Sequence, residues 1–313
     1  MLKLSVLELR ALSVLSESPK AVGQLAASLG ASKSLASRVA RSLQDKGLAS
    51  ASKEGVKKMV CISEAAHAQA FKRLLQSRPN ARIEEWLSGF ALDVLVVAGP
   101  FIEGADKERL YEECACSRAT VNKTVRKLRS AGVAMELYEA QRFAVTDGLV
   151  SGFAAACADW LQLRAQKGLQ GYNVSVRVGK HVVLRTDARQ VPAGFTVTGM
   201  TALIRSGLPL TPTSHTDYYY QLDGSAHQLR IEEQFAHALL LATLPQHAGD
   251  RTSLAIFLAT RHDLNNRLLA EAAKRFLVSG LYEELRRVNE LKEKTYGLTP
   301  QGKRKAGGSM VVE

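Results

Sequence analysis

Two segments of this 313-residue chain combine hydroxyl side chains and cations at the spacing of helix turns. The first starts at Ser32 and reads SKSLASRVARSL, and the second starts at Ser117 and reads SRATVNKTVRKL. Arg bridges the O6 and N7 atoms of guanine, Asn bridges adenine, and Ser or Thr binds phosphates or base edges. The residue types therefore indicate non-covalent recognition of double-stranded DNA.

Each segment predicts a helix with an apolar inward face and a polar outward face. Ser32 and Ser117 are the predicted N-caps, beside which backbone N–H groups attract phosphate. The candidate DNA contacts are the outward side chains and the cations of the hairpin after each helix: Ser32, Lys33, Ser34, Ser37, Arg38, Arg41, Lys53, Lys57 and Lys58 in the first copy, and Ser117, Arg118, Thr120, Asn122, Lys123, Arg126 and Arg142 in the second.

The formal charge of +12 favours a polyanionic partner, and this charge is unevenly spread. Residues 1–80 hold 13 Lys and Arg against 5 Asp and Glu, whereas residues 81–168 hold 11 against 12. We therefore expect the first segment to supply most of the attraction to phosphates. The acidic surroundings of the second segment predict a poorer DNA contact, or a winged helix that binds protein instead.

The two segments belong to a repeat with an offset of 85 residues. Seven positions agree in type without a gap, pairing Leu25 with Leu110, Ser32 with Ser117, Lys33 with Arg118, Arg38 with Lys123, Arg41 with Arg126, Leu43 with Leu128 and Gly47 with Gly132. Each copy predicts a helix, a short helix, a longer helix and a β-hairpin. The helices are expected over Leu4–Ser16, Val22–Leu29 and Ser32 to about Lys46, and over Glu85–Ala98, Lys107–Glu113 and Ser117–Ser130.

A turn at Lys53-Glu54-Gly55 and a hairpin over Val133–Thr146 would form the two wings. A further helix is expected after each wing, over Glu64–Gln76 and Leu149–Gln166. Both are apolar on one side, which predicts packing against the domain or against a partner chain.

The segments Ser32–Leu43 with Lys46-Gly47-Leu48, and Ser117–Leu128 with Gly132-Val133, resemble the recognition helices of MarR-type and related winged-helix regulators. The resemblance covers about residues 1–165 in two parts. It implies DNA binding with the third helix in the major groove. Such regulators often bind palindromic sites as dimers, but two copies in one chain would supply a pseudo-dimer, so both a monomer and a homodimer stay open.

The remaining residues, 168–313, predict an α+β region. Strands are expected in a hairpin over Tyr172–Arg185, at Phe195–Thr198 and at Asp217–Leu222, where at least one of three successive tyrosines should be buried. Helices are expected from Thr198 through Ile204 and over Ile231–Ala242, Ser253–Ala259 and Asp263–Ser279. Leu281 to about Lys294 fits a helix or a hairpin.

Two further interpretations of this region stay open. The helix order over 230–313, with Ser279-Gly280-Leu281 placed like Lys46-Gly47-Leu48, allows a third winged helix. The run FTVTGMTALIRSGL and the YYY strand are similar to a segment of AbiEi-type antitoxins. That resemblance implies autorepression and a protein partner at the C-terminal domain, although this chain differs by having two predicted winged helices.

Nothing in the sequence predicts an enzyme, a cofactor or a metal site. The chain has no P-loop, G-x-G-x-x-G, H-E-x-x-H or G-x-S-x-G motif, and its seven His residues lack ligand spacing. Cys114 and Cys116 have no second pair to complete a zinc site, and thiol usage fits a reducing cytoplasm. No apolar run is long enough to span a membrane, and the first residues predict an amphipathic helix rather than a signal peptide.

The sequence thus predicts an α+β protein with winged helices over 1–80 and 81–167 and an α+β region over 168–313. The favoured function is a sequence-specific transcriptional regulator located in the cytoplasm with the nucleoid. Two alternatives are an architectural or replication-associated DNA-binding protein, and an antitoxin-like or assembly factor that binds a protein partner.

Overall fold

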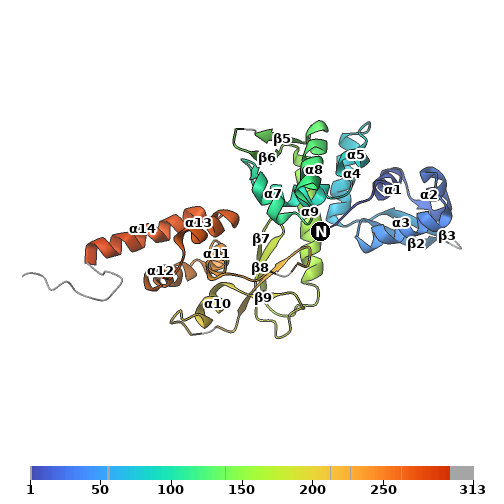
Figure 1. The fold of residues 1–313 in the computed structure, drawn as a ribbon. Coiled ribbons are helices and arrows are strands. Elements are labelled where there is room, and N and C mark those ends of the chain that lie inside the picture. Colours follow the sequence, from blue (N-terminus) through green and yellow to red (C-terminus); the bar gives the residue numbers. More distant parts are fainter. Residues whose placement is uncertain are drawn as a thin grey trace, which may run out of the picture. The chain divides into compact units, whose positions relative to one another are not determined.

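The computed structural model describes residues 2–54, 57–137, 139–211, 213–225, 227–261 and 263–296. The chain divides into two compact units, Met1–Lys167 and Gly168–Glu313 (Figure 1). Helices and antiparallel sheets occur in both units, which confirms the predicted α+β class.

The first half of the first unit has the element order of a winged helix. It contains α1 (Val6–Glu17), β1 (Lys20–Ala21), α2 (Val22–Leu29), α3 (Lys33–Asp45), β2 (Ala49–Glu54), β3 (Lys57–Ile62) and α4 (Ala66–Ser77). The strands form an antiparallel sheet in the order β1-β3-β2. The hydrophobic pattern predicted the four helices of this half to within two residues at each end.

The second half repeats this order of elements. It contains α5 (Ile83–Leu87), α6 (Ala91–Ala98), β4 (Ala105–Asp106), α7 (Lys107–Glu113), α8 (Arg118–Ser130), β5 (Ala134–Leu137), β6 (Arg142–Val145) and α9 (Gly148–Ala165). Its sheet has the equivalent order β4-β6-β5. The prediction of one helix over Glu85–Ala98 was wrong, because Gly89 takes a φ of +76° and its N–H donates to the Leu4 carbonyl at 2.8 Å.

Helices α3 and α8 begin and end in the same way. Ser32 accepts a hydrogen bond from the Leu35 N–H, and Ser117 accepts one from the Thr120 N–H. Gly47 and Gly132 then end the helices at φ values of +68° and +69°, where a residue with a Cβ is strained. The predicted caps and stops are therefore present in both copies.

Helices α4 and α9, one after each wing, pack against each other (Figure 1). The rings of Phe71 and Phe153 are buried between them, with centroids 5.2 Å apart. The apolar faces of these two helices therefore join the two halves of the unit, rather than remaining free.

The second unit is built on a four-stranded antiparallel sheet in the order β7-β8-β10-β9. The strands are β7 (Asn173–Val178), β8 (His181–Thr186), β9 (Thr196–Val197) and β10 (Thr216–Gln221), and the helices are α10 (Gly199–Arg205), α11 (Ile231–Leu241), α12 (Asp250–Thr260), α13 (Asn266–Arg275) and α14 (Ser279–Tyr296), with a 3-10 turn η1 (Pro245–His247) before α12. Tyr219 and Tyr220 are buried, as expected for this strand.

The structure corrects the idea of a third winged helix within the described residues. The segment from Leu281 to Lys294 lies in the single helix α14, so no wing follows α13 there (Figure 1). Leu277, at a φ of +58°, ends α13 in the place expected for Gly280. The alternation that a hairpin requires is missing from this charged segment, and helical periodicity prevails.

Candidate nucleic-acid interface

The outward face of α3 is polar and open to solvent. Its buried residues, which pack against α1, α2 and β2, are Ala36, Val39, Ala40 and Leu43. Every candidate DNA contact on this helix and at its cap is exposed: Ser32, Lys33, Ser34, Ser37, Arg38 and Arg41. The helix therefore separates its packing residues from its candidate contacts, as an inserted recognition helix requires.

The basic side chains on the outward face of α3 are not paired with carboxylates in the described part of the chain. Within the residues that the structure describes, Lys33, Arg38 and Arg41 have no ion-pair partner. Long basic side chains that form no ion pair with the protein are available to phosphates or to base edges. The outward face of α3 thus presents positive charges that are suited to bind an external anion.

A buried carboxylate beside the C-terminal end of α3 faces the domain interior. Glu8 of α1 is buried and accepts hydrogen bonds from Ser42 at 2.7 Å and from Lys46 at 2.5 Å. Burial alone would raise the pKa of Glu8, but the bonds from Lys46, the Ser5 N–H and Ser42 lower it below its ordinary value. Glu8 therefore stays ionised and ties the end of α3 to α1.

Wing one places two cations side by side. Lys53 of β2 and Lys58 of β3 are register partners, and both are exposed. Like charges opposite each other destabilise a hairpin unless an anion lies near them. The pair therefore favours a phosphate-binding wing, whereas the side chain of Lys57 lies outside the described ones.

The outward face of α8 is partly engaged by its own domain. Arg118 pairs with Glu108 of α7 at 3.1 Å and lies over the Tyr111 ring at 5.0 Å. Asn122 accepts a hydrogen bond from the Tyr111 hydroxyl at 2.8 Å. Thr120 is half-buried, and its hydroxyl lies 3.0 Å from that of the capping Ser117. Four of the predicted contacts of this copy are thus used internally.

Two other cations of α8 remain exposed. Lys123 and Arg126 have no ion-pair partner within the described part of the chain. With Lys127, Trp86 and Glu85 they line a shallow cavity of about 400 Å³ between α5 and α8. This copy therefore offers a smaller basic surface, with one carboxylate beside it.

Wing two is a weaker cationic site than wing one. Arg142 is half-buried and pairs with Asp106 at 3.1 Å and with Glu103 at 3.7 Å. Because both carboxylates already neutralise it, a phosphate would gain less from this side chain.

The C-terminal ends of α3 and α8 are each held by an arginine from the other half of the unit. Arg164 of α9 donates to the Asp45 carbonyl at 3.1 Å, and Arg78, after α4, donates to the Ala131 carbonyl at 3.4 Å. Cations at helix C-termini are favourable because the carbonyls there lack partners. These two contacts were not predicted from the sequence, because no local pattern links residues that are 53 or 119 positions apart.

A second residue of α9, Trp160, also packs against the C-terminal end of α3. Trp160 of α9 lies so close to Gly47 that a Cβ there would be 2.7 Å from the indole nitrogen. The Trp160 ring also contacts the ring of His67, 5.1 Å away, whose Nε2 lies 2.9 Å from the Lys46 carbonyl. Gly47 is thus required both for its positive φ and for space, whereas Gly132 has open space around it.

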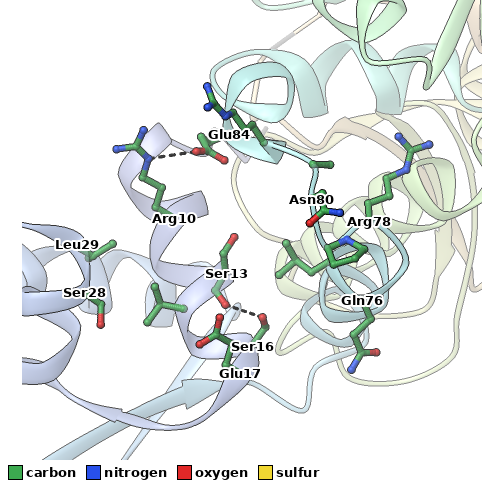
Figure 2. A pocket seen from close by; sticks show the side chains of 15 residues that line it. Arg10, Ser13, Ser16, Glu17, Ser28, Leu29, Gln76, Arg78, Asn80 and Glu84 are labelled. Atoms are coloured by element: carbon green, nitrogen blue, oxygen red, sulfur yellow. Dashed lines mark hydrogen bonds and ion pairs between the residues drawn. The ribbon is translucent and has the colours of Figure 1, made fainter.

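A polar hollow of about 690 Å³ adjoins α1, α2 and the segment between α4 and α5. Figure 2 shows Arg10 of α1 and Glu84 of α5 joined across one end of it, at a distance of 3.3 Å. Ser13 and Asn80 line it from opposite walls (Figure 2). This ion pair connects the first helix of the first copy to the helix that packs beside α8.

Residues 2–55 match the model of the MarR family. The match identifies a MarR-like winged-helix domain, of the DNA-binding helix-turn-helix type found in transcription regulators, and it contains α1 to α3 and β2. Regulators of this family usually dimerise and are generally not enzymes. No curated protein matches the chain.

Among the residues that the structure describes, no helix is both long and apolar enough to cross a bilayer. In the same part of the chain, no cluster of three or more His, Cys, Asp or Glu is placed to hold a metal ion.

Proposed function

We propose that the protein is a sequence-specific regulator that inserts α3 into the major groove of double-stranded DNA. The observation that carries this proposal is the pair Arg38 and Arg41, both exposed and without an ion-pair partner among the described residues, on the capped third helix of the MarR-like domain. Arginines at such positions form bidentate bonds to guanine, each worth about 1–3 kcal/mol of discrimination. Lys53 and Lys58 would hold the backbone beside the groove.

We further propose that residues 81–167 form a second winged helix, which follows the first over 1–80 and precedes the α+β region over 168–313. The repeated element and strand orders support this arrangement. Lys123 and Arg126 occupy the positions of Arg38 and Arg41, so α8 would contact a second half-site more weakly. One chain would then supply both halves of a pseudo-dimer.

The test is fluorescence-anisotropy titration of the full chain with its own upstream DNA and with a random duplex, across a salt series. We expect tighter binding to the upstream DNA and a steep loss with salt, with a logarithmic slope of about −0.9 per phosphate contact. Replacement of Arg38 and Arg41 by Ala should weaken this binding. The matched control is Arg73→Ala, which removes an exposed arginine of α4 and should bind the upstream DNA as tightly as the wild type.

Two results would contradict the proposal. Equal affinity for both duplexes would favour an architectural or replication-associated role, because phosphate contacts alone carry no sequence information. Binding to neither duplex would instead favour an antitoxin-like or assembly role with a protein partner at the C-terminal domain.

A further inference from the structure

The second unit contains a cavity of about 330 Å³ with a buried ion cluster in its wall. Arg185 of β8 donates from Nε and Nη2 to the two carboxylate oxygens of Asp217 on β10, at 2.6 and 3.0 Å. Its Nη1 donates to Asp250 of α12 at 2.8 Å. Most of the remaining lining comes from helix α10 and from Leu210, Thr211, Thr213, His215 and Thr216.

The chain around this cluster is built to hold it. Asp217 also accepts the Met200 N–H at 2.8 Å, at the start of α10. Gly199 lies at a φ of +57°, and a Cβ there would be 2.6 Å from the Asp217 carboxylate. Burial alone would lower the pKa of Arg185, but the bonds and charges of Asp217 and Asp250 raise it. Arg185 thus stays charged, and the bonds to Asp217 and Asp250 hold it in place.

The cavity retains polar groups that the protein does not use. In the described residues, Arg205 has no ion-pair partner, and the Oδ1 atom of Asp250 accepts no hydrogen bond. The hydroxyl groups of Ser253 and Thr216, which also line the cavity, have no bonded partner there either. One free cation and one free carboxylate oxygen therefore accompany free hydroxyl groups.

The charges and the apolar lining restrict what fits. Arg185 and Arg205 balance Asp217 and Asp250, so a ligand with net charge would leave that charge uncompensated. A purely apolar ligand would leave the free polar groups without partners. The aliphatic side chains in the wall favour a ligand with an apolar part: Met200, Ile204 and Leu210.

We propose that this cavity binds a free amino acid with an aliphatic side chain. Its carboxylate would pair with Arg205, its ammonium group would pair with Asp250, and its side chain would lie against Met200 and Ile204. The volume is at the lower end of the range of small-molecule sites, which suits a ligand of this size. This site is independent of the proposed DNA contact.

The experiment is isothermal titration of the full chain with leucine, isoleucine, valine and methionine. Leucinamide and N-acetyl-leucine are the matched probes, because each lacks one of the two charges. We expect at least one of the four amino acids to bind, and its blocked forms to bind at least about tenfold more weakly. Absence of binding by all four at about 10 mM, or equal binding of the blocked forms, would overturn the proposal.

Variants locate the site. Arg205→Ala removes an exposed side chain and should weaken binding about tenfold, whereas Arg189→Ala, equally exposed and outside the cavity, should leave it unchanged. Asp250→Asn keeps the size of the side chain and should weaken the free amino acid more than its N-acetyl form. Unchanged binding by Arg205→Ala would overturn the proposal even if the Asp250 variant fails to fold.

Discussion

The two halves of the first unit share their elements but differ in what surrounds their recognition helices. Arg38 and Arg41 of α3 occupy the same helical positions as Lys123 and Arg126 of α8. Beside α3 the carboxylate of Glu8 is turned inward, whereas beside α8 the carboxylate of Glu108 binds Arg118. The repeat thus sets where the cations lie, and the neighbouring residues decide which of them are free for DNA.

The same comparison shows how the two halves depend on each other. Arg78 and Arg164 each hold the end of the recognition helix in the opposite half, so neither α3 nor α8 is supported by its own half alone. The support is unequal, because Trp160 covers only the end of α3. These contacts link the ends of the two helices, which suits the proposed binding of two half-sites on one duplex.

The largest expected effect is a difference in DNA affinity between variants of α3 and variants of α8. The double variant Arg38→Ala, Arg41→Ala should lose affinity for the upstream DNA on the order of 100-fold, because two unpaired arginines contribute about 1–3 kcal/mol each. The double variant Lys123→Ala, Arg126→Ala should lose on the order of 10-fold, since its surroundings are more acidic. Both losses are measured by fluorescence anisotropy at one salt concentration.

Equal losses in the two double variants, or a larger loss on α8, would overturn the ranking. Circular dichroism and thermal unfolding are the controls for folding. All four side chains are exposed, so neither variant should shift the melting temperature by more than a few degrees.

The second effect compares the two helix stops. Gly47→Ala should lower the free energy of unfolding by about 2–4 kcal/mol, because it combines strain at positive φ with overlap on Trp160. Gly132→Ala should cost about 1 kcal/mol, since only the strain remains there. Urea unfolding measures both.

The double variant Gly47→Ala, Trp160→Ala isolates the clash. Its loss should be smaller than the sum of the two single losses, because removal of the indole makes room for the new methyl group. Strict additivity would show that Trp160 does not press on the end of α3.

The third effect concerns two buried carboxylates at equivalent positions, Glu8 and Asp93. Glu8→Gln should destabilise the unit by about 1–2 kcal/mol at neutral pH, because it removes a charged partner of Lys46. Asp93→Asn should cost less, since an amide oxygen still accepts the Ala115 N–H.

The direction of the pKa shift of Glu8 determines how its contribution to stability changes with pH. The pKa of Glu8 is lowered in the folded protein, so its contribution is complete above its ordinary value of 4.5 and declines as the pH falls through the lowered pKa. The difference in unfolding free energy between wild type and Glu8→Gln should therefore shrink below about pH 4.5. A difference that grows on acidification would contradict this assignment.

Local signals in the sequence were sufficient for most of the fold. The caps Ser32 and Ser117, the stops Gly47 and Gly132, and the apolar spacing between them define α3 and α8 because helix ends depend on neighbouring residues. The segment of α14 was predicted as a helix or a hairpin, and its lack of strand alternation is the local sign that favours the observed helix.

The candidate site was less predictable, for a physical reason. Side-chain types identified Arg118 and Asn122 as outward residues, but their engagement by Glu108 and Tyr111 depends on how α7 lies beside α8. The hold of Arg164 on Asp45 joins residues 119 positions apart, and no periodicity reports such a contact. Composition did indicate the difference between the copies, through the acidic residues of the second.

The smallest expected effect is a gain in DNA affinity when Arg118 of the second copy loses its ion-pair partner. Glu108→Gln removes the carboxylate that pairs with Arg118, and both side chains are exposed, so the folded state should lose less than about 1 kcal/mol. Arg118 then faces DNA without a competitor, and affinity for the upstream DNA should rise about twofold at low salt. The gain should vanish at high salt because exposed charges are screened. Glu64→Gln, an exposed carboxylate after wing one, serves as the control for the change in net charge. An equal gain in both variants would show that α8 makes no specific use of Arg118, and that the second copy contributes only its overall charge.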